Sequence, residues 1–307
     1  MKMFLSLVAV LLIAVTIKAQ TPTELYNQGV DLMTQQQYEQ AIEKFKAAAL
    51  ADANHKESRL GLATAYFKLS QWDNAIIALK EVMTLAPDDM AALEMLAKAQ
   101  LNAKKYADAI ISFDKLIAVK TDNPDLYMFL GNSAAGNKDD VKAEKAYLKA
   151  IELKTTTVSV YHKLAIMYQK QKKMKDAIAI LEKALPVKED QKTYYYLGKF
   201  LYVDKGFVKA EEYLKKAFEM DSKDEDSAYY LTKTYIELKK FADAVTVGEA
   251  LITLKKTEPK YCAALGDAYR LNGEKDNALK TYQAGAQYSG EYGTYCTQMI
   301  DFLKKQK

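Results

Sequence analysis

The stretch from Lys56 to Asp89 reads KESRLGLATAYFKLSQWDNAIIALKEVMTLAPDD, and its spacing of small and large residues recurs along nearly the whole chain. Its small residue Ala75 belongs to a column that repeats every 34 residues, apart from one interval of 33. The members of this column are Ala41, Ala75, Ala109, Ala143, Ala177, Ala210, Ala244 and Ala278. A period of this length, held in phase through eight copies, indicates a solenoid of stacked repeats.

Two further columns share this period. A small or short residue lies twelve positions before each periodic alanine, at Gly29, Ala63, Ala97, Gly131, Ala165, Gly198, Thr232 and Gly266. A bulky residue lies four positions after it, at Phe45, Leu79, Phe113, Tyr147, Leu181, Leu214 and Tyr282, whereas Gly248 breaks the column. Small residues let two helices cross closely, and large ones fill the holes between helix pairs. The pattern therefore predicts units of two antiparallel helices that bury their apolar faces by stacking on neighbours.

These columns, together with Leu62, Tyr66, Trp72 and Pro87 of the quoted stretch, resemble the tetratricopeptide repeat. The resemblance implies an all-α fold, a right-handed α-solenoid of about eight helix-turn-helix repeats with a C-terminal capping helix. The expected repeats span 22–292, divided into 22–55, 56–89, 90–123, 124–157, 158–190, 191–224, 225–258 and 259–292, and the capping helix spans 293–307. We expect the capping helix to have one apolar face, made of Met299, Ile300, Phe302 and Leu303.

Residues 1–19 have the order of a secretory signal peptide, with a positive charge at Lys2, an apolar middle and a small residue at Ala19. The apolar run is shorter than the roughly 20 residues that a membrane-spanning helix needs, so we expect cleavage after Ala19. An uncleaved anchor is the alternative, because Ile17 is larger than the cleavage site prefers. The segment resembles bacterial signal peptides, and its Ala-Gln ending resembles those of Bacteroidetes. This resemblance implies a periplasmic or secreted protein.

The composition argues against several classes of function. The formal net charge of the chain is +4, without the concentrated basic surface that nucleic-acid binding needs. His55 and His162 are the only histidines, and the two cysteines lack the spacing of metal ligands. The sequence contains no glycine-rich phosphate loop and no nucleophile elbow. We therefore expect a protein that is not an enzyme and that holds no metal and no cofactor.

In the tetratricopeptide family, the first helices of the repeats line a groove for peptides or protein segments. In the sixth and seventh repeats this resemblance selects an aromatic and basic set, with neighbouring tyrosines added: Tyr195, Tyr196, Lys199, Tyr202, Tyr229, Tyr230 and Lys233. Tyrosine offers a rigid apolar ring with a polar tip, which suits an extended peptide or a glycan. The structural alternative is that these rings pack helix against helix, as we expect for Tyr194. We expect a scaffold of the bacterial cell envelope with a protein or peptide partner, or else a module that binds carbohydrate or peptidoglycan.

One binding device of the family is missing from this sequence. The family's clamp for a C-terminal carboxylate needs lysine at the fifth place of a repeat. That place holds Tyr26, Leu60, Glu94, Met128, His162, Tyr195, Tyr229 and Ala263, so we do not expect this clamp.

Cys262 and Cys296 are 34 residues apart and fall at like positions of neighbouring helices. Such positions lie about 8–10 Å apart, beyond the roughly 7 Å limit for a disulfide, but a shifted capping helix leaves the bridge possible.

Overall fold

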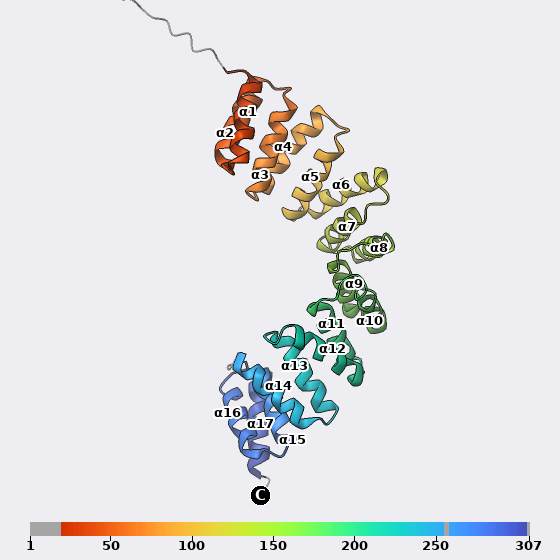
Figure 1. Ribbon diagram of the computed structural model, residues 1–307, viewed down its shortest axis with the longest axis vertical. Helices are drawn as coiled ribbons and strands as arrows, with labels where there is room; N and C mark the ends of the chain where they lie inside the picture. Colours follow the sequence, from red (N-terminus) through yellow and green to blue (C-terminus); the bar gives the residue numbers. More distant parts are fainter. Residues whose placement is uncertain (1–19, 255–257, 306–307) are drawn as a thin grey trace, which may run out of the picture. The chain divides into compact units, whose positions relative to one another are not determined.

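The structure is a computed structural model that describes residues 20–254 and 258–305. Every regular element within these ranges is a helix, so the expected all-α solenoid of helix-turn-helix repeats is confirmed (Figure 1). The described helices are α1 (Pro22–Thr34), α2 (Tyr38–Ala51), α3 (Lys56–Lys68), α4 (Trp72–Leu85), α5 (Met90–Asn102), α6 (Tyr106–Val119), α7 (Pro124–Gly136), α8 (Asp140–Glu152), α9 (Ser159–Lys170), α10 (Met174–Glu182), α11 (Gln191–Val203), α12 (Phe207–Met220), α13 (Glu225–Glu237), α14 (Phe241–Leu254), α15 (Pro259–Leu271), α16 (Lys275–Gly285) and α17 (Glu291–Lys305).

The chain divides into two compact units, each built from stacked helix pairs. Within the described residues, the first comprises 20–121 with Asn132–Asn137, and the second comprises Asp122–Gly131 with 138–254 and 258–305. In the first unit, α1 packs against both α2 and α3. In the second unit, α11 packs against α12 and α13, α13 against α15, and α15 against α16 and α17. In the second unit the first helices α11, α13 and α15 therefore lie next to one another and form a continuous face.

The expected signal peptide, residues 1–19, lies outside the described residues. Among the helices that the structure describes, none combines the length and apolar character needed to cross a bilayer.

The turn between the two helices of each repeat has a constant backbone form. One residue of the turn adopts positive φ in every repeat, at Gln36, Ser70, Lys104, Lys138, Lys172, Lys205, Lys239 and Gly273. In the first repeat, the Gln37 N–H donates to the Leu32 carbonyl at 2.9 Å and the Gln36 N–H donates to Met33 at 3.1 Å. This is the Schellman pattern, which satisfies the last carbonyls of a helix and reverses the chain. Only the eighth repeat places glycine at the left-handed position.

The two columns of small and bulky residues meet in space. The bulky residue of a second helix packs on the small residue sixteen positions earlier, in the first helix of the same repeat. A Cβ added to Gly29 would lie 2.5 Å from the Phe45 ring, and one added to Gly131 would lie 2.5 Å from the Tyr147 ring. Gly198 with Leu214 and Gly266 with Tyr282 form equivalent pairs. Glycine at these four positions thus creates the space that the large side chain fills.

The single 33-residue step coincides with a short helix. Helix α10 has 9 residues, whereas the corresponding α12 has 14. A turn follows α10 and contains Pro186, which has no N–H to donate to a helical carbonyl. The shortened helix agrees with the effect expected of this proline.

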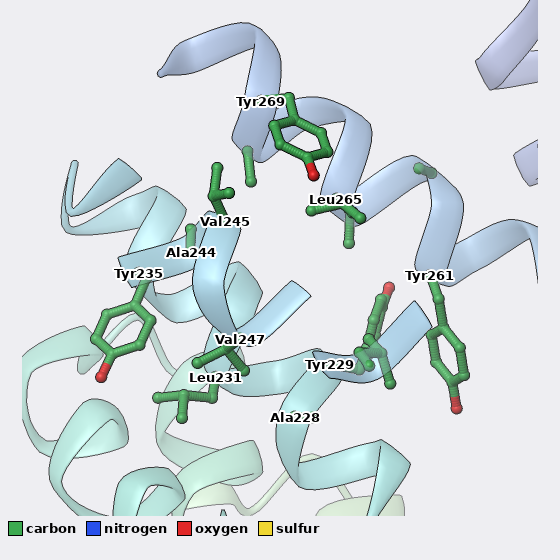
Figure 2. Close-up of a cluster of buried hydrophobic side chains, with 14 of the residues drawn as sticks. Ala228, Tyr229, Leu231, Tyr235, Ala244, Val245, Val247, Tyr261, Leu265 and Tyr269 are labelled. Atoms are coloured by element: carbon green, nitrogen blue, oxygen red, sulfur yellow. The ribbon is translucent and has the colours of Figure 1, made fainter. Parts of the chain in front are cut away.

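The C-terminal repeats share a core with the capping helix. Figure 2 shows part of this core, including Tyr229 and Tyr261 side by side and Leu265 further along α15. In α17, Leu303 and Cys296 are buried, and Met299 and Ile300 pack against the core. The expectation that Phe302 joins this face is wrong, because its side chain is 46% exposed. A helix turns by about 100° per residue, which carries position 302 away from the face that buries position 303.

Candidate tyrosine-lysine binding site

Six of the seven expected site residues line one cavity in the second unit, with a volume of about 380 Å³. We call it the Tyr-Lys cavity. Helix α11 contributes Tyr195, Lys199 and Tyr202 to its wall, and α13 contributes Tyr229, Tyr230 and Lys233. Val203, Asp226, Lys260 and Tyr292 complete the lining. Helices α11 and α13 both begin at the first position of their repeats. Equivalent positions of neighbouring first helices face the same side, so these side chains come together in one cavity.

The seventh expected residue, Tyr196, does not line the cavity, although its ring centroid lies 5.2 Å from that of Tyr195. Its ring makes an edge contact with His162, with ring centroids 5.4 Å apart, and packs near Phe200 at 5.9 Å. Tyr196 therefore joins α9 to α11 and does not line the Tyr-Lys cavity. Tyr194, expected to pack between helices, is 4% exposed and stacks on Tyr213, in agreement with that expectation.

The cavity tyrosines form a connected series of rings. Tyr230 lies 6.2 Å from Tyr195, 5.7 Å from Tyr202 and 5.3 Å from Tyr229, measured between ring centroids. The Tyr229 ring then lies 5.6 Å from Tyr261 on α15. Only 7% of Tyr229 is exposed, so this ring is mainly part of the core and presents one edge to the cavity. The series gives the site a rigid aromatic floor.

Three lysines lie over these rings. The Lys199 ammonium is 5.5 Å from the Tyr195 centroid and 5.4 Å from that of Tyr230. Lys233 is 5.3 Å from Tyr202 and 5.6 Å from Tyr229. Lys260 is 5.6 Å from Tyr229 and 4.8 Å from Tyr261. These are cation–π distances, at which the negative face of the ring attracts the ammonium group.

The three lysines differ in their carboxylate neighbours, because Lys260 also lines a pocket with Asp221, Asp224, Glu225 and Asp226. Asp226 lies 3.8 Å from Lys260. Within residues 20–254 and 258–305, Lys199 and Lys233 have no carboxylate within 4.0 Å. The Lys199 ammonium instead donates to the Tyr195 hydroxyl at 3.2 Å. An incoming anion therefore finds its available positive charge at Lys199 and Lys233, because Lys260 already faces Asp226.

The phenol groups stay neutral. Burial raises the pKa of Tyr195, Tyr229 and Tyr230 above the ordinary value of 10. Their O–H groups consequently remain hydrogen-bond donors across the physiological pH range.

A second and larger cavity, of about 550 Å³, adjoins the first and is called the C-terminal cavity. The two share Tyr229, Lys233, Lys260 and Tyr292. The remaining lining residues are Ile236 and Glu237 of α13, Ala263, Ala264 and Asp267 of α15, and Glu291, Thr294, Tyr295 and Gln298 of α17. The Tyr229 and Tyr292 hydroxyl oxygens are 3.4 Å apart. The repeat pattern does not predict the α17 residues of this lining, because α17 lies outside the period and was expected only to cap the solenoid.

A partly buried carboxylate fixes the wall of the C-terminal cavity. Asp267 accepts hydrogen bonds from the Tyr282 and Tyr295 hydroxyls, each at 2.7 Å, and lies 3.4 Å from the Arg270 guanidinium. These groups come from α15, α16 and α17. The shared carboxylate therefore holds the three helices in one arrangement.

The two cysteines are buried and are not joined by a disulfide in the structure. Both face Gly285, where an added Cβ would lie 2.6 Å from the Cys296 sulfur and 2.9 Å from the Cys262 Cβ. Burial raises the pKa of Cys296 to about 11 and also raises that of Cys262. Both groups are therefore neutral thiols at physiological pH. Across the described residues, no group of three or more His, Cys, Asp and Glu side chains is arranged to hold a metal ion.

Comparison with protein families finds tetratricopeptide-repeat models. One matches residues 94–156 and another matches residues 262–286. A model described as "Anaphase-promoting complex, cyclosome, subunit 3" matches residues 35–116 and 170–249, which together exceed half of the chain.

Among characterised proteins, the chain is 26% identical over 151 residues to the BBSome complex member BBS4 of Bos taurus and 25% identical to that of Mus musculus. The match covers 49% of this chain but only 29% of each of these relatives.

Three solved structures have similar folds. The C-terminal part of a repeat protein from Cytophaga hutchinsonii has a TM-score of 0.68 and 20% identity, covering 78% of this chain and 99% of that one. A tetratricopeptide repeat protein from Parabacteroides merdae has a TM-score of 0.54 and 14% identity, covering 81% and 99%. YrrB, described as a protein "with an unusual peptide-binding site", has a TM-score of 0.53 and 20% identity, covering 57% and 91%.

Proposed function

We propose that this chain, which belongs to the tetratricopeptide-repeat family, is a scaffold of the bacterial cell envelope. In this role it binds an extended peptide or protein segment. Proteins of this family are generally binding scaffolds, and their fold is typically non-catalytic. The proposed binding surface is the face of first helices in the second unit, centred on the Tyr-Lys cavity. The location in the envelope rests on residues 1–19, which have the order of a signal peptide.

The observation that carries the proposal is the pairing of rigid rings with lysines that lack carboxylate partners. Tyrosine rings provide contact area at low entropic cost, and ammonium groups held over them can meet backbone carbonyls or carboxylates of a peptide. Preorganisation matters here, because each lysine is already positioned by two rings before a ligand arrives. A volume of about 380 Å³ is within the range of small-ligand and side-chain pockets.

Carbohydrate or peptidoglycan is the second candidate ligand. The Tyr195, Tyr202 and Tyr230 rings favour it, because flat aromatic faces also accommodate apolar faces of sugars. The lysines distinguish the two ligands. A neutral glycan leaves Lys199 and Lys233 without a charged partner, whereas an acidic peptide pairs with them.

Binding assays on the mature chain test the proposal. Purified protein is used to capture envelope proteins from a bacterial extract, and in parallel is applied to a glycan array. The double variant Tyr195→Ala, Tyr202→Ala removes two half-buried rings of the cavity and spares the buried Tyr229. The matched control is Tyr288→Ala, because Tyr288 is 39% exposed and lines neither cavity.

We expect the double variant to lose at least about tenfold in affinity for the captured protein, and the control to bind like the parent chain. Equal binding by the double variant would place the site elsewhere. Binding to glycans alone, with the same dependence on the two rings, favours the carbohydrate candidate. For the location, the mass of the protein purified from its natural host decides between cleavage after Ala19 and retention of Met1.

A further inference from the structure

The C-terminal cavity exists because the eighth repeat carries small residues where the two preceding repeats carry tyrosines. Ala263 occupies the fifth place of its repeat, and the other seven repeats all hold a larger side chain there. In α11 and α13 the fifth and sixth places are the pairs Tyr195-Tyr196 and Tyr229-Tyr230. In α15 the same places are Ala263-Ala264. The fifth-place and sixth-place tyrosines of α11 and α13 therefore have no counterpart in α15, where Tyr261 continues the ring contacts from the third place. A space is left beside Ala263 and Ala264.

One part of the wall of this space is aromatic and apolar. Ala263 and Ala264 are 4% and 6% exposed and form the floor. Tyr229, Tyr292 and Tyr295 supply ring faces and edges, and Ile236 adds an aliphatic contact. A volume of about 550 Å³ exceeds what one ring needs, so backbone of the same ligand also fits. Aromatic rings favour edge and offset contacts with other rings, each stabilising by about 0.5–1.5 kcal/mol beyond area burial.

Charge is distributed unevenly along the cavity. Lys233 and Lys260 lie where the two cavities join, each 5.6 Å from the same Tyr229 ring. Three acidic residues also line the cavity: Glu237 and Glu291, which are exposed, and Asp267, whose oxygens are already engaged by Tyr282 and Tyr295. At the lysine end, Asp226 lies 3.8 Å from Lys260, whereas Lys233 has no carboxylate of the described residues within 4.0 Å. A ligand carboxylate is therefore attracted chiefly to Lys233 and repelled from the acidic side. This asymmetry gives the ligand a direction.

We infer that the C-terminal cavity receives an aromatic side chain of the bound peptide, and that a carboxylate next to this side chain pairs with Lys233 and Lys260. The ligand ring takes the place that Tyr195 and Tyr229 occupy in the preceding repeats and so extends their series by one ring. The carboxylate belongs either to an acidic neighbouring residue or to the free C-terminus of the peptide. This inference rests on the proposed function, since it assumes that the ligand is a peptide.

A library of random twelve-residue displayed peptides is the probe. Selection on the mature chain is expected to enrich peptides with an aromatic residue beside Asp or Glu, or at the free C-terminus. Enriched peptides are then synthesised with free and with amidated C-termini, and with the aromatic residue replaced by alanine. We expect the alanine replacement to weaken binding at least about tenfold. Loss of affinity on amidation identifies the C-terminal carboxylate, and no loss identifies the side-chain carboxylate.

Two protein variants test the cavity directly. Ala263→Tyr fills the space with the residue that the two preceding repeats carry, and we expect at least about tenfold weaker binding. Ala263→Ser is the matched control, because it adds only one small atom and should bind like the parent. The double variant Lys233→Met, Lys260→Met keeps the apolar stems and removes both charges, so we expect weaker binding that no longer falls with added salt. The lysine variant and the altered peptides stay informative if Ala263→Tyr fails to fold.

The outcomes separate the two proposals. Enriched peptides that need Tyr195 and Tyr202 but bind Ala263→Tyr as well as the parent would overturn this inference and leave the proposed function in place. A consensus without an aromatic residue beside a carboxylate overturns the inference in the same way. Absence of any enriched peptide counts against both.

Discussion

Replacing Gly29 with alanine should loosen the first repeat, because the added methyl group collides with a buried ring. The new Cβ would lie 2.5 Å from Cε1 of Phe45, about 1 Å inside the usual 3.5–4.0 Å separation of carbon atoms. Phe45 is only 1% exposed, and on its other side it meets Gly61, where an added Cβ would lie 2.7 Å away. The ring is held between α1 and α3 and has no free space to move into. Overpacking of this kind costs about 1–3 kcal/mol.

Hydrogen exchange is the appropriate assay, since the repeats of a solenoid can open separately. A cost of about 1–3 kcal/mol makes amide exchange in α1 and α2 roughly 5-fold to 150-fold faster. Gly206→Ala is the control, because its Cβ would lie 3.3 Å from the flexible end of Leu201. That variant should stay within about 0.5 kcal/mol of the parent.

A second substitution tests the cause. Gly29→Ala combined with Phe45→Leu reproduces the pair Ala63 and Leu79, which is fully buried in the next repeat. The double variant should be more stable than the sum of the two single effects by at least about 1 kcal/mol. Unchanged exchange in Gly29→Ala, or simple additivity in the double variant, would refute the claim that these residues are matched in size.

Three further predictions concern single positions. Lys172→Gly should stabilise the fold by about 0.5–1 kcal/mol and so raise the urea midpoint, because Lys172 has φ 62° and glycine tolerates this conformation. Gly273→Ala should lower the urea midpoint for the opposite reason, because Gly273 also has a positive φ. Burial lowers the pKa of His162 below its ordinary 6.5, so the unfolded chain binds more protons. Stability should therefore fall as pH drops below about 6.5, and His162→Gln should flatten this dependence in denaturant titrations. Asp267→Asn should destabilise the C-terminal repeats by about 1–3 kcal/mol, seen as faster exchange in α17, because Asn holds the Tyr282 and Tyr295 hydroxyls and Arg270 less strongly.

Much of the candidate site follows from the repeat register. Equivalent places of neighbouring first helices face the same side, so Tyr195, Lys199 and Tyr202 meet Tyr229, Tyr230 and Lys233 around one cavity. The register does not predict how far each ring is buried or which way it turns. Tyr196 turns to His162, and Tyr229 lies mostly within the core, because the neighbours of each ring differ from repeat to repeat.

The amino-acid sequence by itself determined the helix pairs, their period and their stacking order, because each depends on contacts within a repeat or with the next one. The packing of Phe45 on Gly29 is a contact of this local kind. The left-handed turn at Gln36 is likewise a local feature of one repeat. Only the tertiary structure decided the C-terminal cavity. Helix α17, which follows no repeat pattern, supplies Tyr292 and Tyr295 to the lining that also contains Ala263. Contacts made once, between a repeat and a helix outside the period, leave no regular signal in the sequence.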